Sequence, residues 1–260
     1  MDLQLNDKRV LITGGTRGIG LACALAFANE GCNVTIVGSR PESVDAALLR
    51  FSPEQRGRVD GIAADLGQRG AAARLGEPLA GADIVVNNAG AIPGGGLERV
   101  DDAQWRAAWD LKLYSYVDTT RTALPAMMAR GHGVIVNVIG IAGAAPRYDY
   151  LCGSMANAAL TSFTHAVGAH ASANGVRVVG VNPGPTETDR LVTLTRARAR
   201  ERFGDDEQWP QMLAHLPFGR ATQPDEIADL VVFLASSRAS YLSGVVVDAD
   251  GGALYSPHHA

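Results

Sequence analysis

Lysine is nearly missing from this 260-residue chain. Of its 23 lysine and arginine residues only Lys8 and Lys112 are lysines, which leaves 21 arginines. The chain therefore does not use lysine as ordinary surface cover, and the place of each lysine calls for an explanation. With 27 acidic residues the formal net charge is −4, so no excess of positive charge favours a nucleic-acid partner.

Cysteine and long apolar runs are also scarce. The three cysteines cannot close a disulfide framework, and their spacing to the six scattered histidines fits no zinc template, so we predict no metal site. No run approaches the roughly 18 apolar residues of a membrane-spanning helix, and the first residues show no secretion-signal pattern. We expect a cytoplasmic protein without a membrane partner.

The chain does have enough apolar residues for a full core, since 47% of it is hydrophobic. Its length fits one large domain or two small ones at about 100–200 residues each. No linker, repeat or low-complexity segment divides it. We therefore predict a single domain over residues 1–260.

Short runs rich in valine and isoleucine alternate with longer helical patterns along the whole chain. The runs do not alternate apolar with polar residues, which is typical of strands buried on both faces of a parallel sheet. Strands separated by helices indicate an α/β fold with a Rossmann-like, doubly wound sheet of about seven parallel strands and helices on both faces. The expected strands are Arg9–Thr13, Val34–Val37, Gly61–Ala64, Ile84–Val86, Val134–Val138, Val176–Val181 and Val245–Asp248.

Residues 188–223 form a long connection between the sixth strand and a helix that begins near Pro224. An insertion after the carboxyl end of a strand lies over the ligand crevice, so we interpret it as a substrate lid. It contains four arginines at alternate positions, Arg196, Arg198, Arg200 and Arg202. Because alternate helical positions point to different sides, these arginines favour a solvated face over an anion site.

A glycine-rich segment from Thr13 to Gly20 follows the first strand directly and opens a helix over Gly18–Asn29. Glycine permits the tight turn and lets backbone N–H groups approach a pyrophosphate, which the helix N-terminus then favours. The strand–turn–helix setting predicts a dinucleotide site. The residues expected to contact the ligand here are Gly14, Thr16, Arg17, Gly18, Ile19 and Gly20.

The end of the second strand decides the expected nucleotide. An acidic side chain there would bind the 2′-hydroxyl of a ribose, but the chain has Ser39 and Arg40 instead. Together with Arg17, these donors match a 2′-phosphate, so we predict NADP(H) over NAD(H). The alternative is that Arg40 only caps the following helix.

Several further motifs follow the ends of the expected strands. They are Asp65-Leu66, Asn87-Asn88-Ala89-Gly90, and Asn182-Pro183-Gly184 with Thr186 and Thr188. On these motifs and the glycine loop, the chain resembles the short-chain dehydrogenase/reductase family over nearly its whole length. The resemblance implies that these segments bind the nicotinamide dinucleotide, with Asp65 at the adenine, Asn88-Ala89-Gly90 at the ribose, and Pro183, Gly184 and Thr188 at the nicotinamide. It also implies a homodimer or homotetramer.

The catalytic residues of that family are absent from their usual places. The family uses a tyrosine, a lysine four residues later, a serine and an asparagine. Gly140 stands at the serine position, Gly153 at the tyrosine position and Asn157 at the lysine position. Lys112 stands where the asparagine is expected, so lysine and asparagine are exchanged while both hydroxyls are gone.

Four residues are therefore our candidates for a rebuilt catalytic site. Lys112 would be the proton donor or oxyanion stabiliser, because burial lowers the pKa of an amine; the alternative is a structural lysine that bridges helix backbone and loop. Tyr150 or Tyr148, in the loop before Gly153, would supply the missing phenol, unless both only pack in a lid. Asn157 would orient a water.

The function that these residues predict is an NADP(H)-dependent oxidoreductase acting on a small carbonyl or alcohol substrate. One alternative is a non-redox lyase or isomerase that keeps the nucleotide as a scaffold and uses the amine of Lys112. Another is a catalytically silent NADP-binding protein.

Overall fold

The computed structural model describes residues 1–256, and within them seven parallel strands form one sheet. The strand order is β3-β2-β1-β4-β5-β6-β7, so the chain changes direction across the sheet between β1 and β4. Ligands of open α/β sheets bind at the carboxyl ends of the strands beside such a switch point. The doubly wound prediction is confirmed. The strands are β1 (Arg9–Thr13), β2 (Asn33–Gly38), β3 (Val59–Ala63), β4 (Ile84–Asn87), β5 (Gly133–Val138), β6 (Val176–Pro183) and β7 (Val246–Ala249).

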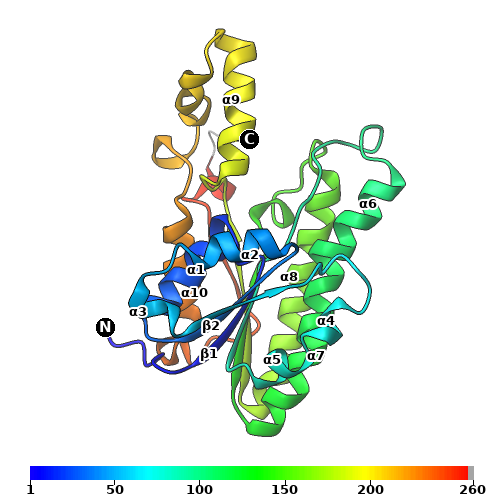
Figure 1. Ribbon diagram of the computed structural model, residues 1–260. Helices are drawn as coiled ribbons and strands as arrows, with labels where there is room; N and C mark the ends of the chain where they lie inside the picture. The colour runs from blue at the N-terminus through cyan, green and yellow to red at the C-terminus, as the bar shows by residue number, and fades with distance from the viewer. Residues whose placement is uncertain (257–260) are drawn as a thin grey trace.

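Helices cover both faces of this sheet (Figure 1). On one face α1 and α10 pack against each other and share a core cluster with the strands, and on the other α4, α5, α7 and α8 lie against the sheet. The helices are α1 (Gly18–Asn29), α2 (Pro41–Leu48), α3 (Pro53–Arg56), α4 (Ala71–Arg74), α5 (Gly76–Gly81), α6 (Asp102–Trp109), α7 (Ser115–Arg130), α8 (Leu151–Ala171), α9 (Asp189–Phe203) and α10 (Pro224–Ala235). None of the helices in residues 1–256 has the length and apolar character needed to cross a membrane.

The strands at the two edges depart from the expected pattern. We predicted a third strand at Gly61–Ala64 that is buried on both faces, but β3 begins at Val59 and exposes Asp60, Gly61 and Ala63. The reason is its place at the edge, where it pairs with β2 alone. Strand β7 is likewise only partly buried, whereas the central strands β4 and β5 are almost fully covered.

The stretch from α6 to α7 is helical throughout but not uniform. A π-helical turn, η1 (Asp110–Tyr114), widens the backbone between the two α-helices, and Lys112 lies at its centre. Such single π turns occur frequently at functional sites. The apolar and polar pattern of the sequence did not reveal this turn.

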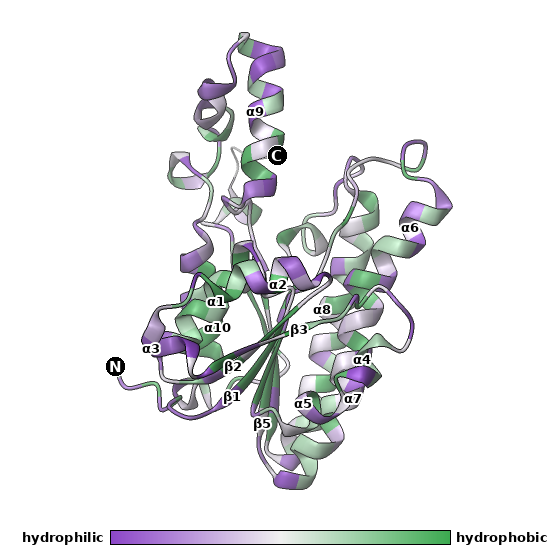
Figure 2. Ribbon diagram, in the orientation of Figure 1, coloured by the Kyte–Doolittle hydropathy of each residue, from purple (hydrophilic) through white to green (hydrophobic). Residues whose placement is uncertain are grey.

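The connection after β6 stands out beyond the carboxyl edge of the sheet as α9 and a 3₁₀ segment, η4 (Asp206–Leu213) (Figure 1). Figure 2 shows that this part is largely polar, in contrast to the apolar strands. Two of its arginines form ion pairs with η4, Arg196 with Glu207 and Arg200 with Asp206. The alternate arginines thus do differ in their surroundings, as the helical spacing predicted.

Candidate active site

The glycine loop after β1 has a backbone conformation that favours glycine, and it is closely packed. Gly14 and Gly18 have φ values of +63° and +53°, in the left-handed region. A Cβ atom on Gly14 would lie 2.9 Å from the Cα of Ala89, and one on Gly20 would overlap the carbonyl oxygen of Gly14. The loop is therefore pressed against the turn after β4 with no room for side chains.

Two further loops meet this one. The side-chain amide of Asn88 donates to the carbonyl oxygens of Thr13 and Gly14 at 3.2 and 3.1 Å. The methyl group of Thr188, which follows β6, lies 3.1 Å from the place of a Cβ on Gly18. The carboxyl ends of β1, β4 and β6 thus converge around the start of α1.

The start of α1 offers free hydrogen-bond donors. The helix begins at Gly18 and no side chain caps its first turn, so its N–H groups point outward without an intrahelical acceptor. The side chains of Arg17 and Arg40 make no hydrogen bond or ion pair within residues 1–256, and Ser39 is exposed beside Arg40. Backbone donors at a helix N-terminus with unpaired guanidinium groups fit the phosphates of a dinucleotide.

The remaining predicted cofactor residues lie along the same edge. The carboxylate of Asp65 is exposed and accepts from the backbone N–H of Gly67 at 3.0 Å. The hydroxyl of Thr186 donates to the carbonyl oxygen of Gly184 at 3.0 Å, which folds the chain back after β6. The others at this edge are Thr16, Ile19, Leu66, Ala89, Gly90 and Pro183.

The amine of Lys112 is buried and surrounded by oxygen atoms. Its Nζ donates to the carbonyl oxygens of Val138 and Ile139, each at 2.9 Å, and to the hydroxyl of Tyr116 at 3.2 Å. Burial lowers the pKa of Lys112 to about 7, while the three acceptors favour its charged form. The side chain thus ties the π-helical turn to the end of β5, and its catalytic role stays a prediction.

Asn157 occupies the space that a side chain at position 140 would need. Its Nδ2 lies 2.9 Å from the place of a Cβ on Gly140, which has a φ of +137°. The residue is only 3% exposed, and its amide makes no side-chain hydrogen bond within the described residues. Lys112 and Asn157 therefore both approach the segment 138–140 at the carboxyl end of β5.

Tyr150 occupies the space at position 153. A Cβ atom on Gly153 would overlap the Cε1 and Cζ atoms of the Tyr150 ring. The hydroxyl of Tyr150 makes no hydrogen bond within residues 1–256. Burial raises the pKa of Tyr150, and the positive charge of Arg190 acts in the opposite direction, so the phenol stays protonated at neutral pH.

Tyr148 has different surroundings. Its side chain is 59% exposed, and its hydroxyl donates to the carboxylate of Glu98 at 2.6 Å. A Cβ on Gly96 would overlap its ring, so Tyr148 packs on the loop after β4. The structure separates the two tyrosine candidates, with Tyr150 turned to position 153 and Tyr148 on the surface.

Arg190 is a residue of this region that the sequence reasoning missed. It lies in the first turn of α9, and its guanidinium donates to the carbonyl oxygen of Ile92. Ile92 belongs to the same apolar cluster as Tyr150 and Cys152. Thr188, whose hydroxyl caps α9, was a signal that a helix starts here and turns its first residues toward the end of β6.

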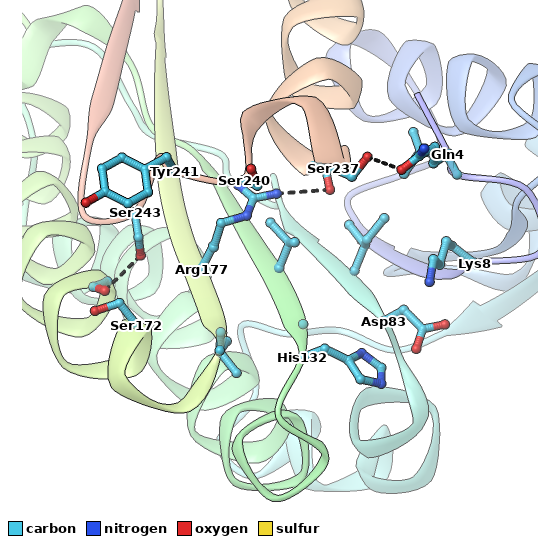
Figure 3. A pocket seen from close by; sticks show the side chains of 18 of the residues that line it. Gln4, Lys8, Asp83, His132, Ser172, Arg177, Ser237, Ser240, Tyr241 and Ser243 are labelled. Atoms are coloured by element: carbon cyan, nitrogen blue, oxygen red, sulfur yellow. Dashed lines mark hydrogen bonds between the residues drawn. The ribbon is translucent and has the colours of Figure 1, made fainter. Parts of the chain in front are cut away.

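A hollow of about 810 Å³ lies at the amino-terminal ends of β4, β5 and β6, opposite the carboxyl ends described above. The residues that line it include Lys8, Asp83 and His132 (Figure 3). Its most buried cation, Arg177, donates to the carbonyl oxygens of Leu234, Ala235 and Ser236 at the end of α10. That arginine caps α10 and is thereby occupied. The hollow shares no residue with the dinucleotide site described above.

The comparisons with known proteins agree with this geometry. A family model described as enoyl-(acyl carrier protein) reductase matches residues 14–254. The uncharacterized oxidoreductase YvrD of Bacillus subtilis is 34% identical over 98% of this chain and 100% of its own length. The structure of L-sorbose reductase from Gluconobacter frateurii, complexed with NADPH and L-sorbose, superposes with a TM-score of 0.92 at 31% identity, covering 98% of this chain and 100% of that chain.

A further solved structure, titled short chain dehydrogenase/reductase family protein, is 35% identical with a TM-score of 0.85 and covers 97% of this chain and all of its own. These matches span the glycine loop, the turn after β4 and the strand order with its switch point. The chain belongs to the short-chain dehydrogenase/reductase family of oxidoreductases.

Proposed function

We propose that this protein is an NADP(H)-dependent oxidoreductase that reduces a small carbonyl substrate, with Tyr150 as the proton donor. The observation that carries the proposal is the Tyr150 ring at position 153, where the family would have its catalytic tyrosine. A phenol three residues earlier in the chain thus reaches the region from which the usual phenol has been lost.

Three unpaired donors support the choice of NADP(H). Arg17 precedes the first turn of α1, and Ser39 and Arg40, instead of an acidic residue, directly follow β2. The similar L-sorbose reductase is complexed with NADPH. When bound, the reduced nicotinamide supplies a hydride to the substrate.

The protonation state of Tyr150 suits a proton donor. Its hydroxyl is protonated at neutral pH because burial raises its pKa, so it can donate to a carbonyl oxygen as negative charge develops there. The phenolate left behind would gain from the positive charge of Arg190. In the oxidative direction Tyr150 would first have to lose its proton before it could act as a base.

Lys112 and Asn157 then act as positioning residues. The three N–H groups of the Lys112 ammonium are directed at three oxygen acceptors, which fixes the carbonyl groups of Val138 and Ile139. This arrangement does not favour Schiff-base chemistry on Lys112. The unpaired amide of Asn157, next to Gly140, is available to orient a water or a ribose hydroxyl.

The test is oxidation of NADPH, followed by absorbance, against a panel of ketones and aldehydes. Tyr150→Phe should lower kcat about 10²- to 10⁴-fold, as expected for loss of a general acid. Tyr148→Phe separates the two candidates and should change kcat little. A Tyr150→Phe enzyme with wild-type rates would reject the assignment, and NADPH binding without any turnover would favour a silent nucleotide-binding protein.

We also propose a homodimer or homotetramer. Tyr114 and Met155, at the start of the two long helices, are each about half exposed. Light scattering after size-exclusion chromatography would show a mass of two or four chains, and a monomer would contradict the proposal.

A further inference from the structure

The arginines of α9 fall into two sets. Arg196 and Arg200 pair with carboxylates of η4, as described above. Arg190, Arg198 and Arg202 make no ion pair within residues 1–256, although all three are exposed. Arg190 and Arg198 are eight residues apart, which places them about 80° apart around the helix and about 12 Å apart along its axis.

The start of α9 contacts the loop after β4. The guanidinium of Arg190 donates to the carbonyl oxygen of Ile92, which packs in one apolar cluster with Tyr150. Arg190 also acts electrostatically on Tyr150, and Arg198 acts on Asp149, the preceding residue. The hydrogen bond from Arg190 to Ile92 places the start of α9 against the loop after β4.

Arg190 has capacity for another ligand. A guanidinium carries five N–H donors in a planar fork that matches a carboxylate, and Ile92 uses one of them. Leu194, one helical turn further along the same face, is 49% exposed. An unpaired cation beside the proposed proton donor, followed by an apolar side chain, forms a surface that suits an organic anion.

We propose that the substrate is an oxo acid, whose carboxylate binds Arg190 while its carbonyl oxygen faces Tyr150. This inference rests on the proposed function and specifies its substrate class. Arg198, further along the same helix, would attract the anion during approach and interact with the carboxylate of longer substrates.

The experiment compares acids with their neutral methyl esters as carbonyl substrates for NADPH oxidation. The pairs are pyruvate and methyl pyruvate, acetoacetate and methyl acetoacetate, and levulinate and methyl levulinate. The measured quantity is the ratio of kcat/KM for acid and ester, because any effect of Arg190 on Tyr150 acts on both and cancels. In at least one pair the wild-type protein should prefer the acid, and Arg190→Ala should lower that ratio about 10- to 100-fold, as for a lost charged hydrogen bond.

Arg202→Ala is the matched control on the same helix, since its guanidinium lies over the ring of Phe203. It should leave the acid-to-ester ratio unchanged. Arg190→Lys, which keeps the charge but loses the fork, should give an intermediate ratio. Two results would overturn the inference and leave the proposed reductase intact. One is an equal kcat/KM for acid and ester in every pair, and the other is an acid-to-ester ratio that Arg190→Ala does not change.

Binding without turnover separates the two proposals. Calorimetric titration of levulinate into the protein with NADP⁺ should show binding that Arg190→Ala abolishes, with circular dichroism confirming that the variant is folded. Such binding without reduction of any acid or ester would reject the proposed reductase while keeping the anion site. Absence of both binding and reduction for all three acids would overturn the inference.

Discussion

At the carboxyl ends of the strands, two regions are packed in different ways: one half lies around β1 and β4, the other around β5 and α8. Around β1 and β4, glycine backbone lies directly against glycine or alanine backbone, as at Gly14 and Ala89. Around β5 and α8, two glycines are instead covered by side chains, Gly140 by Asn157 and Gly153 by Tyr150. Gly143 in the same half still packs on the backbone of α8. A backbone-to-backbone contact tolerates no added atom, whereas a side-chain contact can be rebuilt by a change elsewhere.

The loops around β1 and β4 therefore tolerate fewer substitutions than the positions covered by Asn157 and Tyr150. Asn88 and Thr13 lock the first half through four short hydrogen bonds to backbone groups. In the second half, Lys112 and Asn157 both lie near segment 138–140. Chemistry can therefore change in one half of the edge while the dinucleotide site stays constant.

The largest effect should come from adding one carbon to the backbone-packed half. In Gly20→Ala the new Cβ would overlap the carbonyl oxygen of Gly14, which cannot rotate away, so we expect a loss of about 3 kcal/mol in stability and of NADPH binding. Urea unfolding and NADPH titration measure both. Gly57→Ala is the control, since no atom lies within 4 Å of its Cβ site and its φ is −70°; it should stabilise by about 0.5 kcal/mol. Equal stability of the two variants would remove the contrast between the halves.

A double-mutant cycle tests whether Tyr150 fills the place of residue 153. Gly153→Ala alone must displace the Tyr150 ring and should destabilise by about 2 kcal/mol. In a Tyr150→Ala background the same change should be nearly neutral, because the overlapping ring is gone. The expected coupling is about 1–2 kcal/mol, measured by urea unfolding. Additive effects would show that the two positions do not share space.

Nucleotide preference should change by a smaller amount. Arg40→Ala removes an unpaired guanidinium beside the end of β2 and should raise KM for NADPH about tenfold, as for a lost charged hydrogen bond, with little change for NADH. Arg50, exposed two residues beyond the end of α2, is the control, and its change to alanine should alter neither value. If both nucleotides lose affinity equally, Arg40 does not bind the 2′-phosphate.

The two lysines of the chain should differ in their effect on the pH dependence of stability. The pKa of Lys112 is about 7 in the folded protein and about 10.5 when unfolded, so between these values the unfolded chain binds more protons. Stability should therefore rise with pH above about 7, by at most about 1.4 kcal/mol per pH unit, relative to Lys112→Met. Lys8 is exposed, and Lys8→Met should follow the wild type in urea unfolding. Parallel curves for wild type and Lys112→Met would contradict the shifted pKa.

The elements that could be predicted from the sequence are those that depend on neighbouring residues in the chain or on backbone conformation. The seven strands, the glycine loop and its place before α1 follow from residue types and short spacings, so they could be predicted. The exposed edge strand β3 could not, because whether a strand lies at an edge depends on the order of strands. The π-helical turn at Lys112 also escaped, since its spacing differs from an α-helix by a single residue.

The sequence by itself determined the fold class and the glycine loop after the first strand, because both depend on which residues are neighbours in the chain. Only the tertiary structure decided which of two nearby tyrosines turns inward, and that the buried amine of Lys112 is directed at three oxygen atoms. It also brought Arg190 from α9 to Ile92, 98 residues away. Such contacts between distant segments depend on how whole helices pack on the sheet, and no short pattern in the chain encodes that packing.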